Sequence, residues 1–475
     1  MRINRVLVAN RGEIAVRIVR TLRDLGRESV AIYADVDQES LHRSMADFSV
    51  RLSGQGVAQT YLNIEQIVAI AQSSGADAVH PGYGFLAESV AFCRAVEEAG
   101  LVFIGPSAVA MQCLGDKIAA RKLMIEHQVA VVPGGVKPLE NVAELAACIE
   151  DIGLPVILKA SGGGGGRGMR VVRRLEDMAL SFEQCQREAL QCFGNDAIFC
   201  ERYIESPRHI EFQVLCDVYG NGVHLFERDC SIQRRHQKLF EEAPSVYLSS
   251  QQRNTLGAEA VRAVLAAGYC GLGTVEFICE SPDQAYFMEV NTRIQVEHPV
   301  TECITGIDLV AEQIRVAEGK ALAWKQDEIR LHGWSMEARI NAEDPAQQFL
   351  PTPGRVQRWS VPLGPHVRLD SHVYEGYTIP DAYDSMIAKL IVWGNTREEA
   401  IARLKRALAE LKVEGIPTTA LFHSALLNCP KFVAGDFDTS YMQAEWEWAA
   451  TAARLAPHAD EIAEISLVGM LGEMG

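Results

Sequence analysis

The sequence predicts a multidomain protein in which an N-terminal α/β domain is followed by larger α+β domains. The chain has 475 residues, which is enough for about three domains of roughly 150 residues each. Up to about residue 112, strand-like apolar runs alternate with helical patterns, as is typical of a parallel sheet. After residue 115, helical stretches mix with pairs of alternating runs, a pattern that favours antiparallel strands.

Composition excludes several classes of function. Hydrophobic residues make up 48% of the chain and charged residues 23%, which is ordinary for a globular protein. The formal net charge of −17 argues against binding to duplex nucleic acid, which requires a basic surface. The chain start lacks the apolar core of a secretory signal, and no stretch approaches the ~18 apolar residues of a membrane span. Twelve cysteines without a CxxC pair predict reduced thiols and a cytoplasmic protein.

The first part of the chain predicts a Rossmann-like parallel sheet. Arg5 to Asn10 form an expected buried strand, and the helix after it ends at Gly26. The alternation continues with strands expected at 29–35, 76–84 and 101–105 and with helices at 63–75 and 91–100. The turn after the first strand reads ANRGEIA and lacks the GxGxxG phosphate motif, so we do not expect NAD binding.

The rest of the chain predicts mixed α+β domains. A helix is expected at 116–128, and residues 209–229 form an expected hairpin with its turn at YGNG. From about residue 329, the sequence favours strands at 335–343, 355–362, 366–373 and 386–394, followed by a helix at 396–415. The last residues, 446–475, are expected to form a helical appendage.

The segment KASGGGGGRGMRVV, residues 159–172, contains consecutive glycines between two strand patterns. Glycine costs roughly 0.5–1 kcal/mol relative to alanine inside a regular element, so the run indicates a loop with a function. Bare backbone N–H groups can surround an anion, and Lys159 and Arg167 add positive charge. We therefore predict a β-hairpin whose flap covers phosphate groups, with a surface linker as the alternative. The P-loop motif GxxxxGK[ST] is absent.

A second hairpin predicts a metal site. Two alternating runs flank SPDQ, with Pro282 at the favoured second position of a type I turn. Counting from that turn places Glu276 directly opposite Glu289, with Cβ atoms about 4.5–5.5 Å apart. Facing carboxylates repel unless a cation lies nearby, and Asn291 adds an amide oxygen on the same face. These ligands suit Mg²⁺ or Mn²⁺ shared with phosphate; a solvent-facing acidic surface or a shifted register is the alternative.

The same alternation continues beyond Asn291. If the chain stays extended, Arg293, Gln295 and Glu297 lie on the same side as Asn291. A guanidinium, an amide and a carboxylate in one row could hold a small oxyanion and accept its proton. A plain edge strand would alternate in a similar way.

Positive charge gathers in the segment ERDCSIQRRHQKLFEEAP, residues 227–244. A solvated basic loop would account for this segment alone. Together with the glycine flap and the metal hairpin, it predicts a pocket for an anionic substrate. The residues that supply the charge are Arg228, Arg234, Arg235, His236 and Lys238.

The glycine flap, SIQRRHQK and MEVNTRIQVEHPVTE together resemble the biotin carboxylase family of ATP-grasp enzymes. ANRGEIAVRI, HPGYGFLAE, IGPS, RINAEDP and YDSMIAKLI also resemble motifs of that family, in the family's order, over about residues 2–445. The resemblance implies a Rossmann-like domain at 1–114, an ATP-grasp domain at 115–328 with a mobile lid at about 132–203, and a biotin carboxylase C-terminal domain at 329–445. The tail at 446–475 has no counterpart in it.

The resemblance implies that ATP activates bicarbonate as carboxyphosphate and that the carboxyl group then moves to N1′ of biotin. Its nucleotide-binding positions fall on Lys117, Lys159, Gly165, Gly166, Glu201, Tyr203, Ile204, His209, Gln233 and His236. Mg²⁺ or Mn²⁺ ions, at two sites, would be held by Glu276, Glu289 and Asn291. Bicarbonate would contact Lys238, Arg293, Gln295 and the backbone of Val296, with Lys238 and Arg293 also catalytic. Glu297 would deprotonate bicarbonate, Arg339 would stabilise the biotin enolate, and Tyr83 would lie near the biotin ring.

No segment resembles the biotinylated Ala-Met-Lys-Met signature or a carboxyltransferase. The resemblance therefore implies a separate component that forms a homodimer and needs a biotin carboxyl carrier protein and a carboxyltransferase. Acetyl-CoA carboxylase is the first expectation for the complete enzyme. The alternative is the carboxylase subunit of a two-subunit pyruvate carboxylase or of an acyl-CoA carboxylase. Two other classes stay open: another ATP-grasp ligase and a catalytically silent regulatory subunit.

Overall fold

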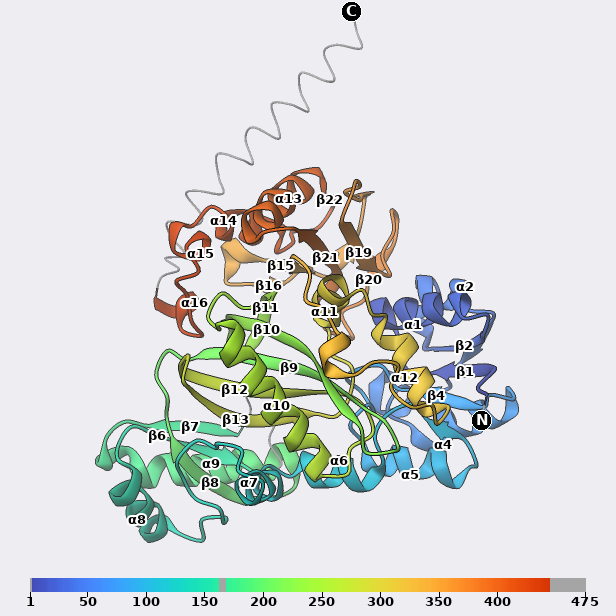
Figure 1. Ribbon diagram of the computed structural model, residues 1–475. Coiled ribbons are helices and arrows are strands. Elements are labelled where there is room, and N and C mark those ends of the chain that lie inside the picture. The colour runs from blue at the N-terminus through green and yellow to red at the C-terminus, as the bar shows by residue number, and fades with distance from the viewer. Residues whose placement is uncertain (1, 162–167, 445–475) are drawn as a thin grey trace, which may run out of the picture.

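The computed structural model describes residues 2–161 and 168–444 of the chain. The expected tail, the consecutive glycines and Arg167 lie outside these residues. Figure 1 shows the N-terminal part and a small three-stranded part on opposite sides of a long central sheet, with the C-terminal helices above it. The expected multidomain combination of α/β and α+β structure is confirmed.

The N-terminal part is a five-stranded parallel sheet in the order β3-β2-β1-β4-β5. Asn63 and Ser89 cap two of its helices by accepting hydrogen bonds from backbone N–H groups. The expected alternation is confirmed, and the structure adds β3 and the short helices, which were not predicted. The elements are β1 (Arg5–Val8), α1 (Gly12–Asp24), β2 (Glu28–Tyr33), α2 (Leu41–Met45), β3 (Phe48–Arg51), α3 (Gly56–Gln59), α4 (Ile64–Ser73), β4 (Ala78–His80), α5 (Val90–Glu98), β5 (Val102–Phe103) and α6 (Ala108–Gly115).

A small antiparallel sheet in the order β7-β6-β8 occupies the range expected to form the lid. Its β6–β7 pair confirms the expected hairpin around the glycine segment. The boundaries expected for the lid and for the domains stay predictions. The elements are α7 (Lys117–Glu126), α8 (Val142–Ile152), β6 (Val156–Ala160), β7 (Met169–Val172), α9 (Met178–Phe193) and β8 (Ile198–Arg202).

The central sheet has eight strands in the order β13-β12-β9-β10-β11-β14-β21-β19. Strand β11 pairs with β14, so the sheet continues across the boundary that the sequence analysis expected near residue 328. Residues from the central and C-terminal regions therefore share one surface. The strands are β9 (Arg208–Cys216), β10 (Gly222–Arg234), β11 (Gln237–Ala243), β12 (Gly271–Ser281), β13 (Gln284–Asn291), β14 (Trp334–Asn341), β19 (Val367–Ser371) and β21 (Met386–Gly394).

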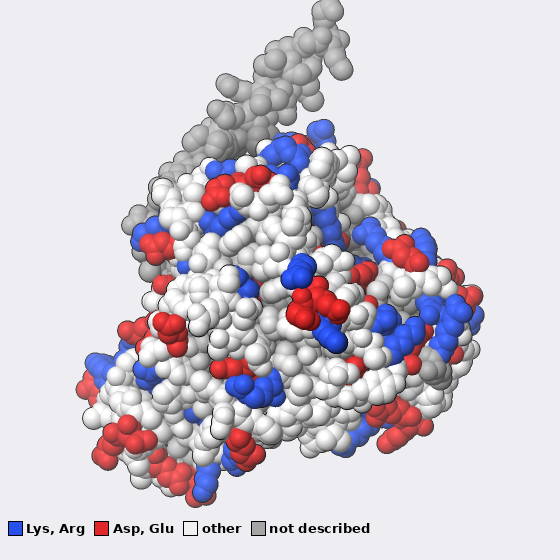
Figure 2. Space-filling model, viewed as in Figure 1, with Lys and Arg blue, Asp and Glu red and all other residues white. Residues whose placement is uncertain are grey.

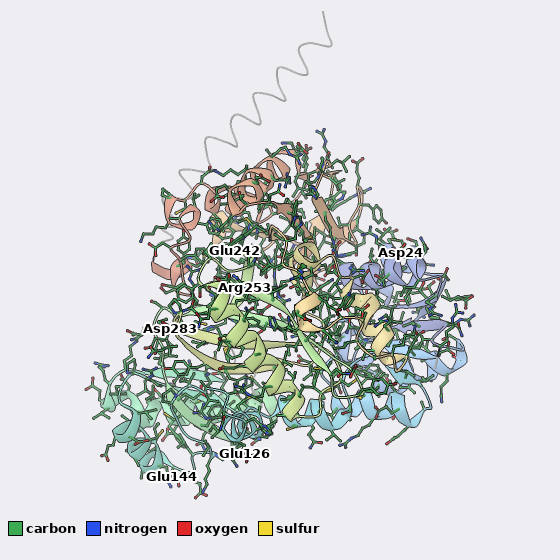
Figure 3. All side chains as sticks on the ribbon, viewed as in Figure 1. Asp24, Glu126, Glu144, Glu242, Arg253 and Asp283 are labelled. Atoms are coloured by element: carbon green, nitrogen blue, oxygen red, sulfur yellow. The ribbon has the colours of Figure 1, made fainter. Side chains whose placement is uncertain are left out.

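Helix α10 (Ser250–Ala266) crosses this sheet and ties its hairpins together. Arg253 binds the buried Glu227 of β10 at 2.7 Å, and Gln252 donates to Asp283 at 2.6 Å in the turn between β12 and β13. Arg253 and Asp283 are labelled in Figure 3. The helix thereby fixes the hairpin that was expected to hold a metal.

Two expected elements of the C-terminal part differ in the structure. The strand expected at 355–362 is divided, because β17 (Gly354–Arg355) pairs with β20 (Thr378–Ile379) whereas β18 (Arg358–Ser360) pairs with β22 (Lys412–Glu414). The helix expected at 396–415 ends at Glu410, since the residues after it form β22. The other elements are α11 (His298–Thr305), α12 (Leu309–Ala317), β15 (Glu343–Asp344), β16 (Leu350–Pro351), α13 (Arg397–Glu410), α14 (Ala420–Leu426), α15 (Pro430–Val433) and α16 (Tyr441–Ala444).

Acidic and basic side chains are interspersed over the face shown in Figure 2. All twelve cysteines are free, as expected. Within residues 2–161 and 168–444, no helix has both the length and the apolar character needed to cross a bilayer.

Candidate active site

A cavity of about 960 Å³ lies between the central sheet, the three-stranded sheet and the turn after β4. Its volume is within the range of small-molecule and cofactor sites. Gly165 and Gly166 lie outside the described residues. Every other site residue that the resemblance implied lines this cavity: Tyr83, Lys117, Lys159, Glu201, Tyr203, Ile204, His209, Gln233, His236, Lys238, Glu276, Glu289, Asn291, Arg293, Gln295, Val296, Glu297 and Arg339. Arg228, which the sequence predicted for the anionic pocket, is instead fully buried behind it and binds Glu211.

Three glutamates face one another across neighbouring strands of the central sheet. Glu276 of β12 pairs in register with Glu289 of β13 on one side and with Glu211 of β9 on the other. The predicted pairing of Glu276 with Glu289 is therefore confirmed. Two register shifts between Glu276 and Ser281 cancel each other, so counting back from the turn reaches the correct pair. Like charges in these positions repel, and the row requires cations.

Lys238 of β11 supplies a cation to this row. Its Nζ donates to Glu211 at 2.5 Å, to Glu276 at 3.0 Å and to Glu297 at 2.7 Å. It also donates to the side-chain oxygen of Gln295 at 3.1 Å. Burial alone would lower the pKa of Lys238, but the three carboxylates raise it well above its ordinary value. The lysine therefore stays charged.

The turn between β10 and β11 aims Lys238 at the row. Arg235 and His236 adopt positive φ angles of 50° and 64°, which are uncommon for residues other than glycine. Strain of this kind persists where the surrounding structure over-determines a functional position. The resulting tight hairpin pairs Gln233 with Lys238, and the Gln233 amide lies 2.8 Å from Nδ1 of His209.

His209 connects the same row to the nucleotide side of the cavity. Its Nε2 lies 2.9 Å from Glu276. Burial alone would lower the pKa of His209, but Glu276 raises it. Burial alone would raise the pKa of Glu276, but Lys238 and His209 hold it well below its ordinary value. Burial and the charge of His209 lower the pKa of His236, which favours a neutral ring there.

The segment after Asn291 does not stay extended, so the expected continuation of the strand was wrong. Strand β13 ends at Asn291, and the chain then turns into α11, whose first turn contains Pro299. Proline is favoured in the first turn of a helix, so Pro299 favours a helix start at this point, and the extended chain must end before it. The side chains of Gln295 and Glu297 nevertheless both contact Lys238, because the turn between β13 and α11 orients them toward it.

Arg293 points toward the N-terminal part of the protein. Its guanidinium donates to Glu88 at 2.9 Å and to the side-chain oxygen of Asn291 at 3.0 Å. Glu88 also accepts from the backbone N–H of Thr292 at 3.2 Å. The end of the metal hairpin is thus attached to the loop that follows β4.

Arg339 of β14 enters the cavity from the C-terminal end of the sheet. Its guanidinium donates to Glu241 of β11 at 2.6 Å and to Glu297 at 3.0 Å. Burial raises the pKa of Glu241 to about 7. Burial alone would also raise the pKa of Glu297, but Lys238 and Arg339 hold it well below its ordinary value. Glu297 is ionised, and its affinity for a proton depends on these two cations.

The opposite end of the cavity contains two further lysines. Lys117 begins α7, whose N-cap Asp116 accepts from two backbone N–H groups at 2.9 Å, and its Nζ contacts Glu289. Lys159 of β6 lies 2.5 Å from Glu201 of β8. Each lysine is therefore paired directly with a carboxylate at the end of the cavity where a nucleotide is expected.

Tyr203 and Ile204 follow β8 and line the connection to the central sheet. The backbone N–H of Tyr203 donates to the carbonyl of Pro155 at 2.9 Å. This bond fixes the start of the segment that was expected to hold adenine.

Sequence reasoning missed several charged residues of this site: Glu88, Arg121, Glu211 and Glu241. Arg121 lies 2.6 Å from Glu201 and thereby helps to hold it. Glu88 belongs to the HPGYGFLAE motif, which was noted without a role for this residue. Glu211 lies in an alternating strand, but only the pairing of β9 with β12 places it beside Glu276.

Three family models cover most of the chain. Biotin carboxylase, N-terminal domain, matches residues 2–111; Carbamoyl-phosphate synthase L chain, ATP binding domain, matches 116–325; and Biotin carboxylase C-terminal domain matches 337–444. Biotin carboxylase 1 of Bacillus subtilis (strain 168) is 51% identical over 442 residues, which cover 93% of this chain and 98% of that protein. The chain belongs to the biotin carboxylase family. The resemblance stated from the sequence is confirmed.

The names of other similar proteins assign them to different biotin-dependent carboxylases. A pyruvate carboxylase subunit of Methanothermobacter thermautotrophicus is 47% identical, over 92% of this chain and 89% of that protein. A solved structure of the biotin carboxylase domain dimer of Hydrogenobacter thermophilus 2-oxoglutarate carboxylase, in complex with MgADP, ADP and bicarbonate, matches with a TM-score of 0.91. Its sequence is 46% identical, and the match covers 93% of this chain and 98% of that one.

Proposed function

We propose that the chain uses ATP and bicarbonate to carboxylate biotin on a biotin carboxyl carrier protein, by way of carboxyphosphate. The observation that supports this most directly is that Lys238, Glu297 and Arg339 meet in the cavity that also contains Lys117 and Lys159. One end offers cations for nucleotide phosphates. The other end offers a carboxylate base beside cations that can orient small anions.

The donor groups fit a divalent cation and ATP. Glu276 and Glu289 present carboxylate oxygens from facing strands, and oxygen ligands are those that Mg²⁺ and Mn²⁺ prefer. When bound, such an ion neutralises phosphate charge. Asn291 is the weaker candidate ligand, because its side-chain oxygen already accepts a hydrogen bond from Arg293. The chain itself holds the two carboxylates in place through paired strands.

The bicarbonate site follows from the cations around Glu297. The proposed contacts are Lys238, Arg293, Gln295 and the Val296 backbone. Glu297 is the proposed base, and Lys238 and Arg339 keep its pKa low in the arrangement seen here. An anion that draws one of these cations away increases the affinity of Glu297 for a proton. Binding of bicarbonate would thereby activate the base.

Biotin is proposed to enter beside Arg339 and Tyr83. Its ureido nitrogen is weakly acidic, so carboxylation requires stabilisation of charge on the ureido oxygen. Arg339 can supply this charge, since Glu241 and Glu297 hold its guanidinium at the cavity wall. Tyr83 lines the same cavity from the N-terminal part.

The proposed partners are a biotin carboxyl carrier protein, a carboxyltransferase and a second copy of the chain. Biotin carboxylase 1 of Bacillus subtilis (strain 168), which is 51% identical over 98% of its own length, supports the biotin carboxylase step of this proposal. We propose acetyl-CoA as the final acceptor, with a pyruvate or another acyl-CoA carboxylase as the alternative. A cytoplasmic location is proposed from the twelve free cysteines.

The proposed function is tested by incubating the chain with ATP, Mg²⁺, labelled bicarbonate and free biotin. We expect ADP release and labelled carboxybiotin that both require bicarbonate. ATP hydrolysis that depends on an amino acid instead would indicate another ATP-grasp ligase, and no hydrolysis under any condition would indicate a regulatory subunit. Identifying the carboxyltransferase that co-purifies with the chain decides the final acceptor.

A further inference from the structure

Lys389 is a fully buried lysine that the proposed mechanism does not use. It lies in β21 and pairs in register with Arg339 of β14 on one side and with Asp370 of β19 on the other. Two cations directly opposite each other repel, just as two carboxylates do. Lys389 therefore needs anionic or carbonyl partners of its own.

Oxygen atoms from three segments surround the ammonium group of Lys389. Its Nζ donates to the backbone carbonyl of Val296 at 2.8 Å, and it lies 3.2 Å from Glu13 and 3.9 Å from Asp370. The Val296 carbonyl belongs to the turn that presents Glu297 to the cavity. A charge-assisted hydrogen bond to this carbonyl restrains the orientation of the turn.

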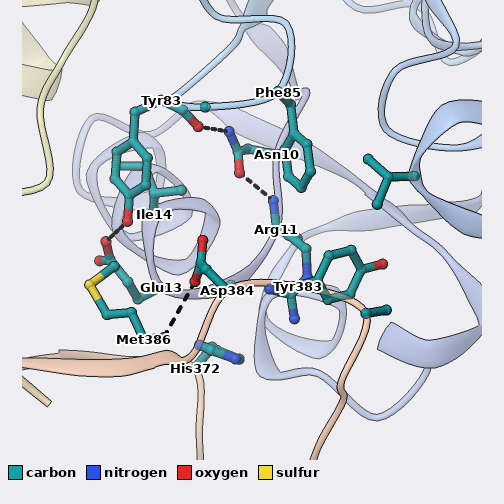
Figure 4. Close-up of a pocket in the computed structure, with 14 residues that line it drawn as sticks. Asn10, Arg11, Glu13, Ile14, Tyr83, Phe85, His372, Tyr383, Asp384 and Met386 are labelled. Atoms are coloured by element: carbon teal, nitrogen blue, oxygen red, sulfur yellow. Dashed lines mark hydrogen bonds between the residues drawn. The ribbon is translucent and has the colours of Figure 1, made fainter. Parts of the chain in front are cut away.

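Glu13 connects Lys389 to the wall of the cavity. It lies in the first turn of α1 and is 3% exposed. Its Oε1 accepts a hydrogen bond from the hydroxyl of Tyr83, which points at it in Figure 4. Tyr83 lines both the large cavity and the smaller neighbouring pocket. A continuous series of contacts thus runs from Tyr83 through Glu13 and Lys389 to Val296.

We propose that Glu13 and Lys389 are positioning residues that couple Tyr83, on the biotin side, to the Val296–Glu297 turn, on the bicarbonate side. The coupling presupposes the proposed function, since it assigns biotin to Tyr83 and the base to Glu297. Hydrogen bonds in a buried, weakly polar environment are strong and directional, so movement of Tyr83 against a ligand is transmitted to the turn. The geometry of the base then depends on whether biotin is present.

A purely structural role for Lys389 would be charge neutralisation of Glu13 and Asp370. Arg397 offers a matched control for that role, because it is also buried and lies 2.8 Å from a buried glutamate, Glu242. It donates to the carbonyls of Phe432 and Val433, which lie outside the cavity lining. Its loss should disturb packing to a similar extent without touching the turn.

The first test compares Lys389→Met with Arg397→Met in bicarbonate-dependent ATP hydrolysis without biotin. We expect Lys389→Met to raise the KM for bicarbonate about tenfold, as loss of a charged hydrogen bond predicts, and to change the KM for ATP less than about twofold. Arg397→Met should leave both KM values within about twofold of the native enzyme. An unchanged bicarbonate KM in Lys389→Met would overturn the coupling.

Tyr83→Phe provides a second test that removes only the hydroxyl group. The coupling predicts a bicarbonate KM raised about threefold even without biotin, whereas a simple biotin contact changes only the KM for biotin. In the double variant with Lys389→Met, the bicarbonate KM should be no higher than in Lys389→Met alone. If the increases in bicarbonate KM of the two single variants multiply in the double variant, the coupling is contradicted.

If Lys389→Met does not fold, Tyr83→Phe together with Glu13→Gln decides the question through the same KM values. The bicarbonate KM of Glu13→Gln should lie between that of Tyr83→Phe and that of the native enzyme, because an amide oxygen can still accept hydrogen bonds from Tyr83 and Lys389. A native chain without any biotin-dependent activity would overturn the proposed function itself. An active native chain with unchanged bicarbonate KM in these variants would overturn only the coupling.

Discussion

Lys238 joins the charges of the candidate site. It contacts carboxylates from three segments, which are β9, β12 and the turn before α11. A lysine surrounded in this way is held in place before any ligand arrives, which is the condition for electrostatic stabilisation of reacting anions. The carboxylates that hold it also compete with substrate for it, so ligand binding must rearrange the pairs.

Glu297→Gln removes the proposed base and keeps the shape of the side chain. We expect carboxybiotin formation to fall by at least about 100-fold, which is the usual contribution of a general base. Nucleotide affinity, measured by calorimetry, should stay within about twofold, because none of the recorded contacts of Glu297 involves Lys117 or Lys159. Glu312→Gln, on α12 outside the cavity, is the control, and an unchanged rate for Glu297→Gln would remove its assigned role.

Lys238→Gln leaves the buried carboxylates without their shared cation. We expect the KM for bicarbonate to rise or turnover to be lost, and the free energy of unfolding to fall by about 3–5 kcal/mol. Steady-state kinetics and urea unfolding measure the two effects. Lys320→Gln, which removes a half-exposed lysine on the surface, should change neither.

Lys238→Gln should also change how the stability of the protein depends on pH. In the native protein the pKa values of Glu276 and Glu297 lie well below the ordinary value of 4.5, so their stabilising effect is present above that pH and lost as pH falls through the folded values. Without Lys238, burial raises these pKa values, and protonation then stabilises the variant. The difference in Tm between native protein and Lys238→Gln should shrink from about pH 7 to about pH 5, and a constant difference would contradict the charge assignment.

Among the secondary-structure elements, the two hairpins of the central sheet determine the site. The β12–β13 pairing could be counted from its turn, because hairpin register is a local property. The end of β13 could not be counted in this way. The strand ends at Asn291, before α11 begins at His298, and the turn between them rather than the alternation of residues directs Gln295 and Glu297.

Gly134 packs against β8 beside Glu201, so a substitution there tests whether this strand positions Glu201. It forms an isolated bridge with Glu201, and an added Cβ would lie 2.4 Å from the carbonyl oxygen of Cys200 and 2.7 Å from Cα of Glu201. These are backbone atoms that cannot move aside, so Gly134→Ala should lower stability by about 1–3 kcal/mol and raise the KM for ATP.

The matched control for Gly134→Ala is Gly194→Ala. A Cβ at Gly194 meets nothing within 4 Å, and only the left-handed conformation, with φ of 70°, is unfavourable for alanine. We expect this change to cost about 1 kcal/mol and to leave the KM for ATP unchanged. Equal effects of the two substitutions on the KM for ATP would contradict a role of β8 in placing Glu201.

At the level of the whole molecule, one continuous sheet combines the two halves of the proposed reaction. Lys238 on β11 and Arg339 on β14 lie on neighbouring strands, so the proposed bicarbonate and biotin positions share a rigid base. The three-stranded sheet that contains Lys159 is separate from it. The proposed nucleotide end is therefore built from both sheets, since Glu276 and Glu289 belong to the central one.

The proposed homodimer gives a prediction for the intact chain. We expect sedimentation at micromolar concentration to show a species of twice the 52.2 kDa chain mass, in keeping with a relative described as a dimer. Sedimentation as a single chain over that range would refute this assembly. Lys238→Gln should sediment like the native chain, since its contacts lie inside the cavity.

The fold class, the facing pair Glu276 and Glu289, and the family could all be predicted from the sequence, because turns, strand register and motif spacing are short-range properties. Long-range packing of the strands was needed to place Glu211, Glu241 and Lys389 at the site. These residues come from strands far apart in the chain, and their charges are tolerated only because burial brings opposite charges and carbonyl groups against them.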